Sequence, residues 1–82
     1  MVKKNEYILD LSTIERAKKF NSIALSFEED IDLIKERYVL DAKSILGIFS
    51  IDISNPVNVK IHTDNDEVSE KFYKSILEFI VG

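Results

Sequence analysis

Ser44 stands directly before an apolar segment in the middle of the chain. Serine is a favoured first residue of an α-helix, because its hydroxyl accepts a hydrogen bond from a free backbone N–H group of the first turn. A phosphoryl group on that hydroxyl would add about −1.5 to −2 charge beside those N–H groups and the positive end of the helix dipole, which is a favourable place for it. A helix that begins here could therefore carry a phosphoserine. The simpler interpretation is a capping serine that is never modified.

The segment after this serine is too apolar on all sides for a short surface helix. Its helical spacing places Ile45, Ile48 and Phe49 close to one face and Leu46 on another. A short helix on a sheet cannot bury both faces, so we expect at least one of Ile45, Leu46 and Phe49 to be exposed, in an apolar patch flanked by Lys43. Exposed apolar surface of this kind marks an interaction site. The alternative is a buried turn, because periodicity cannot place so short a run.

Other polar clusters are better explained by structure than by chemistry. The acidic residues 28–32 are typical of the solvated end of a helix that leads into a strand. The acidic cluster 64–67 lacks the glycine and the distant glutamate of a calcium loop, so we interpret it as a turn and helix cap and predict no metal site. The one histidine, His62, falls on the polar face at the end of a predicted strand, where we expect a surface residue.

Composition excludes several classes of protein. Fifteen acidic and eleven basic side chains give a net charge of −4, the wrong sign for binding a nucleic-acid backbone. Without cysteine there is no disulfide or thiolate metal site, and a cytoplasmic location is the simplest interpretation. No apolar run is long enough to span a bilayer, and the basic start 1–6 leads into a strand without an apolar signal core. We expect a single soluble domain, 1–82.

Apolar periodicity predicts four strands and three helices. Strands are expected at 7–10, 31–34, 38–40 and 57–61, with a hairpin turn at 35–37. The first helix should begin with a capping box, in which Ser12 and Glu15 satisfy each other's backbone donors. The second should run from 44 to 49, and the last should be capped by Asp64 or Asn65. Each long helix has one apolar face, formed in the first by Ile14, Ala17, Phe20, Ala24 and Phe27, and in the last by Val68, Phe72, Ile76, Phe79 and Ile80.

The resulting order of elements is β-α-β-β-α-β-α. It indicates an α+β two-layer sandwich, in which the helices cover one face of an antiparallel sheet. This order, the chain length and the segment 41–51, with its K-S-I-L-G-I-F-S block at 43–50, resemble the HPr family, the histidine phosphocarriers of the bacterial sugar phosphotransferase system.

The resemblance implies a fold, a location and a set of partners. The fold is an open-faced sandwich of four antiparallel strands with three helices on one face. The location is the cytoplasm. The role is in sugar uptake and carbon catabolite control, and we expect neither enzymatic activity nor a cofactor. Ser44 matches the family's regulatory serine, which implies phosphorylation by an ATP-dependent HPr kinase/phosphorylase. Lys43, Ile45, Leu46, Ile48 and Phe49 would then contribute to the patch that protein partners contact, among them a transcriptional regulator of catabolite control.

The front of the first helix departs from the family pattern. Counting back from the serine block places Thr13 where the family has its phosphoacceptor histidine, and a gap of one residue would place Ile14 there instead. A phosphohistidine relay depends on a nucleophilic ring and a labile N–P bond, and a threonine ester does not hand its phosphoryl group onward readily. The sequence therefore resembles a paralogue that has lost carrier activity and acts as a regulatory binding protein. Two alternatives stay open: a phosphocarrier with an atypical acceptor, such as His62, and an adaptor without phosphate chemistry.

Overall fold

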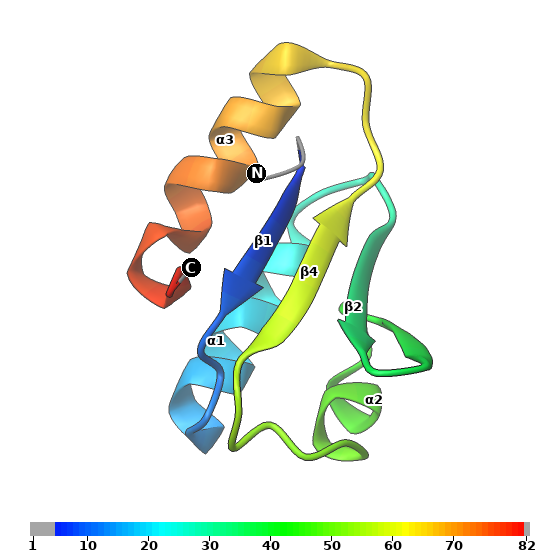
Figure 1. Cartoon of the computed structure of the whole chain (residues 1–82). Helices are drawn as coiled ribbons and strands as arrows, with labels where there is room; N and C mark the ends of the chain where they lie inside the picture. The colour runs from blue at the N-terminus through cyan, green and yellow to red at the C-terminus, as the bar shows by residue number, and fades with distance from the viewer. Residues whose placement is uncertain (1–4, 82) are drawn as a thin grey trace.

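The computed structural model describes residues 5–81 and contains the expected order of elements, β-α-β-β-α-β-α (Figure 1). The strands are β1 (Glu6–Leu9), β2 (Ile31–Lys35), β3 (Tyr38–Asp41) and β4 (Val57–Ile61). The helices are α1 (Ile14–Leu25), α2 (Ile45–Phe49) and α3 (Asp66–Ile76), and a 3-10 turn, η1 (Leu77–Phe79), follows α3. The basic start of the chain, 1–4, on which the expectation of a chain without a signal core depended, lies outside the described residues.

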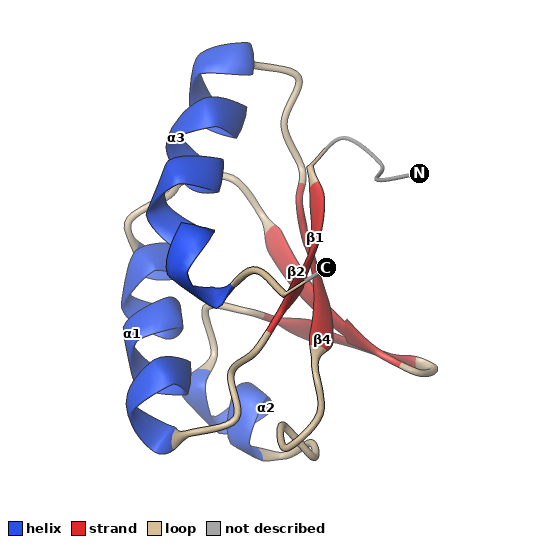
Figure 2. Cartoon of the chain, turned by 60° about the vertical axis from the view of Figure 1, so that its left-hand side comes forward, coloured by secondary structure: helices blue, strands red, loops and turns tan. Residues whose placement is uncertain are grey.

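The four strands form one antiparallel sheet in the order β1-β4-β2-β3. Val59 of β4 lies opposite Tyr7 on one side and Leu33 on the other, so β4 occupies the middle of the sheet although it is the last strand in the chain. The helices lie against one face, and the described part of the chain leaves the other face without a helix (Figure 2). The predicted α+β open-faced sandwich is confirmed.

The core lies between the sheet and the helices. Phe20 of α1 meets Phe79 edge-on, with 6.4 Å between ring centroids, and Phe27 meets Phe72 of α3 in the same way at 5.4 Å. Such aromatic pairs add to the free energy gained by burying the rings, and they pack α1 against η1 and the segment after α1 against α3. The fully buried apolar residues are Leu9, Leu11, Ala17, Phe20, Ala24, Ile31, Leu33, Ala42, Ile48, Val57, Val59, Ile61, Phe72, Ile76 and Phe79.

Helix α1 begins one residue later than its predicted cap. Thr13 precedes the first helical residue, and its Oγ1 accepts a hydrogen bond from the Arg16 N–H at 3.1 Å. The Ser12 N–H instead donates to the Asp10 carboxylate at 3.0 Å. The predicted capping box, in which Ser12 would pair with Glu15, is therefore wrong.

The predicted apolar face of α1 also needs one correction. Ile14 is 67% exposed, whereas Ala17 and Phe20 are fully buried. At about 100° per residue, Ile14 points within about 20° of the buried Asn21, so its exposure follows from its place as the first residue of the helix and not from its direction around the axis. The helix thus leaves one large apolar side chain on the surface at its start.

The end of the chain returns to the first strand instead of continuing as a helix. Asn65 caps α3, as predicted, by accepting hydrogen bonds from two N–H groups of the first turn. After η1, Ile80 pairs with Leu9 in an isolated bridge, and the Val81 N–H donates to the Ile8 carbonyl at 3.0 Å. Ile80 is therefore not part of the closing helix, because β1 offers unpaired backbone groups that the chain satisfies by extending along it.

The hairpin between β2 and β3 is tight and lacks glycine. Lys35 lies opposite Tyr38, so only Glu36 and Arg37 connect the strands, within the predicted turn. Glu36 has a φ of 55°, in the left-handed region that a two-residue turn between antiparallel strands commonly needs. A glutamate at such a position is strained relative to glycine, which explains why composition alone could not define the turn.

Helix α2 offers a direct comparison of a core residue and a surface residue of the same helix. We expect Ile48→Ala to lower the free energy of unfolding by about 2–5 kcal/mol, because it opens a cavity under the helix. We expect Leu46→Ala to change it by less than about 0.5 kcal/mol, because the leucine is 80% exposed. Urea unfolding followed by circular dichroism measures both values, and equal losses in the two variants would contradict this packing.

Candidate functional site

Ser44 forms the cap of α2 that the sequence predicts. Its Oγ accepts a hydrogen bond from the Gly47 N–H at 3.1 Å, and its carbonyl accepts the first helical bond from the Ile48 N–H at 3.0 Å. The Ser44 N–H donates to the Asp41 carbonyl at 3.0 Å. The residue is exposed, so its hydroxyl is held by the backbone on one side and open to solvent on the other. This is a geometry that a modifying enzyme can reach.

Gly47 provides the space beside this hydroxyl. A Cβ atom at this position would lie 3.3 Å from Ser44 Oγ and 3.4 Å from Ser44 Cβ. Contacts this short are tighter than most that real side chains make, so any larger residue would push against the serine. The glycine thus keeps the region around the hydroxyl open.

The exposed side of α2 forms an apolar patch, which we define as Ile45, Leu46 and Phe49. Leu46 is 80% exposed, Phe49 is 42% exposed and Ile45 is half-buried. Lys43 borders the patch and is also half-buried. Ile48, which the sequence analysis assigned to the same patch, is fully buried in the core. That assignment is wrong, because a helix of this length packs on the domain through a single inward position.

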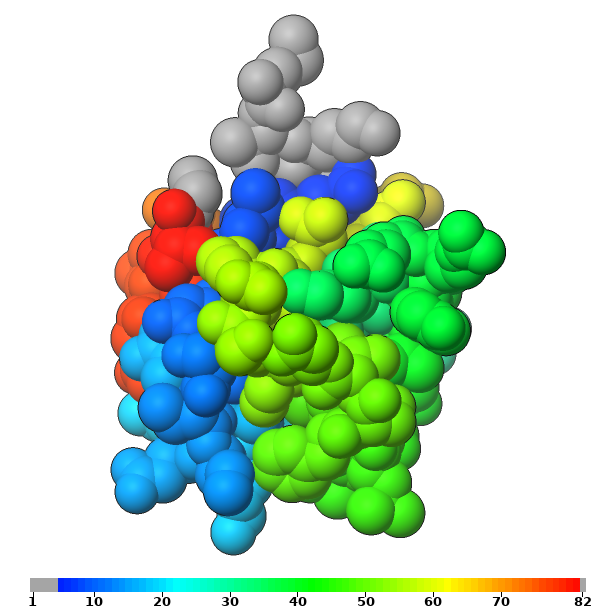
Figure 3. Space-filling view, turned by 60° about the horizontal axis from the view of Figure 1, so that its bottom comes forward, coloured from blue at the N-terminus to red at the C-terminus, as the bar shows by residue number. Residues whose placement is uncertain are grey.

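The start of α1 lies beside α2 on the same face of the molecule (Figure 3). A buried hydrogen bond from Asn21 Nδ2 of α1 to the Ala42 carbonyl, at 3.1 Å, joins α1 to the segment before α2. Ile14, the first residue of α1, is a further exposed apolar side chain. Sequence reasoning missed it because the helical period assigned Ile14 to the core.

Thr13, which the sequence comparison predicts at the family's phosphoacceptor position, is exposed at the start of α1. Its hydroxyl caps the helix by accepting a hydrogen bond from the Arg16 N–H. The next residue of this turn with a charged, exposed side chain is Glu15. A hydroxyl lacks the neutral ring nitrogen that makes histidine a phosphoryl acceptor near neutral pH. At the start of α1, Thr13 therefore serves as a helix cap and offers no ring nitrogen as a phosphoryl acceptor.

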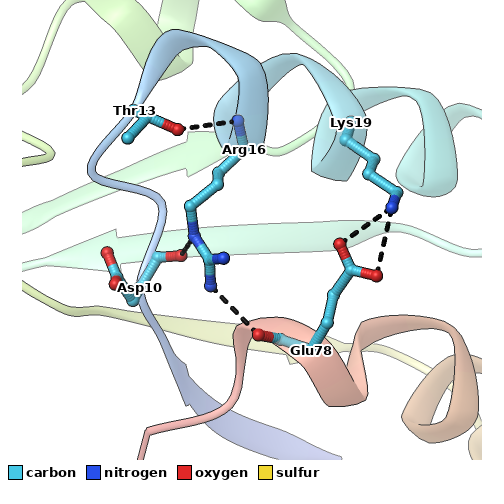
Figure 4. Close-up of polar contacts among 5 residues, drawn as sticks. All are labelled: Asp10, Thr13, Arg16, Lys19 and Glu78. Atoms are coloured by element: carbon cyan, nitrogen blue, oxygen red, sulfur yellow. Dashed lines mark hydrogen bonds and ion pairs between the residues drawn. The ribbon is translucent and has the colours of Figure 1, made fainter.

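Arg16 is bound by protein groups and does not extend into solvent as a free cation (Figure 4). Its Nε donates to the Asp10 carbonyl at 2.8 Å, and its Nη2 donates to the Glu78 carbonyl at 3.0 Å. The guanidinium also lies over the Phe79 ring, 5.0 Å from its centroid. One side chain thus ties the turn before α1 to η1 near the end of the chain. This structural role has no signal in the sequence, because its partners are backbone carbonyls.

The carboxylate of Asp10 adds negative charge next to this helix start. Hydrogen bonds from the side chain and backbone of Ser12, with a smaller contribution from the charge of Arg16, lower the pKa of Asp10 below its ordinary value. Asp10 is therefore ionised at neutral pH, close to the cap that Thr13 forms.

His62 lies far from this helix start. It directly follows β4, whose end lies far from the start of α1, because Val57 at the other end of β4 pairs with Leu9 just before α1 (Figure 1). The His62 side chain is exposed, as the sequence predicts, and its Nε2 lies 2.7 Å from Oδ2 of Asp32. The ring is therefore held on the open side of the sheet, separate from Thr13 and Ser44.

The arrangement of strands and helices matches solved phosphocarrier structures. HPr-C-His from Thermoanaerobacter tengcongensis superposes with a TM-score of 0.70 and 26% identity, over 89% of this chain and 90% of its own. The phosphocarrier protein HPr from Bacillus anthracis str. Ames gives a TM-score of 0.66 and 25% identity, over 87% of this chain and 92% of its own. This chain is an HPr-like protein. Its fold relates it to the proteins of the phosphotransferase system.

A more distant structure supports the fold of this HPr-like chain. The histidine-containing phosphocarrier protein of Mycoplasma covers 94% of the chain with 97% of its own length, at a TM-score of 0.65 and 17% identity. No protein-family model matches the sequence, and no curated protein matches it. In the described residues, no helix is long and apolar enough to cross a membrane. The fold is thus shared with these structures at low sequence identity.

Arg16 and Lys19 allow a matched test of the connection between α1 and the end of the chain. Arg16→Lys keeps the charge but cannot reach both carbonyls, so we expect a loss of about 1–2 kcal/mol in the free energy of unfolding. Lys19→Gln removes an exposed ion pair with Glu78, whose atoms approach to 2.9 Å, and should cost less than about 0.5 kcal/mol. Chemical unfolding of both variants measures the difference. An Arg16 variant as stable as the native chain would show that this connection is dispensable.

Proposed function

We propose that this HPr-like protein is a cytoplasmic regulatory protein of carbon catabolite control, without histidine phosphocarrier activity, that binds protein partners through the apolar patch on α2 and is regulated by phosphorylation of Ser44. It acts by binding and not as an enzyme. The observation that carries the proposal is the accessible Ser44 hydroxyl at the edge of an exposed apolar surface, where Leu46 is 80% exposed.

The loss of carrier activity is supported by the groups around Thr13. The family's acceptor position holds a capping hydroxyl, the neighbouring Arg16 is bound to two backbone carbonyls, and the ionised Asp10 lies close by. Phosphoryl transfer needs a nucleophile together with free positive charge that stabilises the phosphate oxygens. At this place the nucleophile is poor and the positive charge is already engaged.

Regulation through Ser44 is supported by its exposure and its surroundings. The hydroxyl already accepts a hydrogen bond from the first turn of α2, and Gly47 leaves space beside it. A phosphoryl group would place strong acceptors next to these N–H groups and next to Lys43. The same charge would lie at the border of the apolar patch and would therefore change which partners can cover it. HPr kinase/phosphorylase is the modifying enzyme that the family resemblance suggests.

Binding through the apolar patch is supported by the cost of leaving it exposed. A large apolar side chain in water forgoes roughly 1.5–3 kcal/mol of burial free energy, and Leu46 and Phe49 lie on the same short helix. Together with a phosphoryl group on Ser44, these side chains would offer a partner both an apolar contact and an electrostatic one, and this combination favours specificity. A transcriptional regulator of catabolite control is the partner that we propose.

Two other functions compete with this proposal. A phosphocarrier with His62 as acceptor is disfavoured because that ring lies against the Asp32 carboxylate, which would repel an incoming phosphoryl group. An adaptor without phosphate chemistry would use the same patch and differ only at Ser44. Modification of Ser44 therefore distinguishes the proposal from the adaptor.

Incubation with ATP and HPr kinase tests the regulatory serine. We expect one acid-stable phosphoryl group per chain, located on Ser44 by fragmentation mass spectrometry. Ser44→Ala should abolish the modification, whereas Ser50→Ala should not, because Ser50 donates to the Gly47 carbonyl at the other end of α2. No modification of the native chain, or the same modification in Ser44→Ala, would exclude Ser44 as the regulated residue.

Charge substitutions test the patch. Leu46→Glu should leave the melting temperature nearly unchanged and weaken binding to the catabolite regulator by at least about tenfold, since a buried unpaired carboxylate disrupts an apolar interface. Leu25→Glu is the matched control, because Leu25 is 59% exposed at the opposite end of α1. Calorimetric titration of each variant with the regulator measures the affinities. Equal binding by native chain and Leu46→Glu would exclude this surface.

A further inference from the structure

Strand β3 forms an edge of the sheet, and it differs from the other edge. At the β1 edge, the chain end covers the strand through the bridge from Leu9 to Ile80 and the Val81 N–H bond. Within residues 5–81, β3 pairs only with β2. Its side chains Tyr38 and Val39 are 57% and 61% exposed, and the β2–β3 hairpin projects away from the helical layer (Figure 2). An exposed edge with apolar side chains is a template for pairing with another strand.

The register of the hairpin shows which backbone groups face outward. The Ala42 N–H donates to the Ile31 carbonyl at 2.9 Å, so Ala42 directs its backbone groups toward β2. The direction of the backbone N–H and C=O groups alternates from residue to residue along an antiparallel strand. Leu40 and Tyr38 therefore also direct these groups toward β2. Val39 and Asp41 consequently direct their N–H and C=O groups away from the sheet. These outward groups are the ones that an added strand would use.

We propose that two copies of this chain pair antiparallel along β3, about a two-fold axis that passes midway between the two Val39 residues. In this register each Val39 lies opposite Val39 of the second copy, and Tyr38 lies opposite Leu40. Arg37 of each copy then lies opposite Asp41 of the other. The outward-facing N–H and C=O groups of the two Val39 residues meet each other, so the central hydrogen-bonding positions match without any change of register.

Charge complementarity selects a second copy as the occupant of this edge. Charged residues usually protect an edge strand against pairing, but Arg37 and Asp41 have opposite signs at equal distances from Val39. Self-pairing therefore creates two cross-strand ion pairs around a central apolar contact, each of a kind that stabilises antiparallel strands. A shift of two residues toward the C-terminus would place Arg37 opposite Lys43 and lose both pairs.

The geometry leaves these charges available. Asp41 is exposed, and its Oδ1 accepts a hydrogen bond from the Lys43 N–H at 2.9 Å, which orients the carboxylate and leaves Oδ2 for a partner. Arg37 is exposed in the hairpin turn. The pairing does not use Leu46 or Phe49, so the dimer would present two apolar patches. The dimer does not depend on the proposed regulatory function.

Charge reversal gives a sharp test by sedimentation equilibrium. The native chain should show a monomer–dimer equilibrium at concentrations up to about 1 mM. Arg37→Asp places like charges opposite each other twice per dimer, and so does Asp41→Arg, so each should weaken dimerisation by at least about tenfold. An equimolar mixture of the two variants should recover the native affinity, because both ion pairs reform in the mixed dimer. Lys18→Asp carries the same charge change on the exposed surface of α1 and should dimerise as the native chain does.

Three results would overturn the proposal. The first is a native chain that stays monomeric over the whole concentration range. The second is a dimer that Arg37→Asp leaves unchanged. The third is a mixture that fails to recover dimerisation while circular dichroism shows both variants folded.

Discussion

The candidate site depends on the burial of one side chain, Ile48, under a helix of five residues. Such a helix is too short to be stable alone, so its position comes from packing and capping. Ile48 fixes which side faces the core, and the Ser44 cap fixes where the helix begins. The hydrogen bond from the Asn21 side chain to the Ala42 carbonyl fixes the segment before α2 against α1. Because these contacts fix the orientation of the helix, the Leu46 side chain points into solvent.

The start of α1 combines the HPr-like fold with a threonine cap and an arginine that binds backbone carbonyls. A threonine caps the helix, because its hydroxyl lies within reach of the Arg16 N–H. The arginine side chain meanwhile binds carbonyls of Asp10 and Glu78, which ties the end of the chain to the front of the helix. These groups thus contribute to the stability of the domain. The proposed regulatory surface on α2 does not use them.

Much of this arrangement could be predicted from the sequence because it depends on local patterns. Alternation in 57–61, the caps at Ser44 and Asn65, and the helical spacing of Ala17, Phe20 and Ala24 all appear as expected. The errors arose where tertiary contacts decide. Ile14 and Ile48 fit the apolar period equally well, yet one is on the surface and the other in the core. Neither the position of Arg16 nor the return of Ile80 to β1 has a sequence signal, because both depend on backbone groups far along the chain.

Phosphoryl transfer from phosphoenolpyruvate tests the central claim most directly, namely that an HPr-like fold is present without the carrier chemistry. The measurement is the intact mass and the acid lability of phosphate after incubation with phosphoenolpyruvate and the first enzyme of the phosphotransferase system. Phosphoramidates of histidine are acid-labile, whereas esters of Ser44 or Thr13 are not. The account predicts an unmodified chain. Acid-labile phosphate on His62, lost in His62→Ala, would contradict it and would make this protein a carrier with a displaced acceptor.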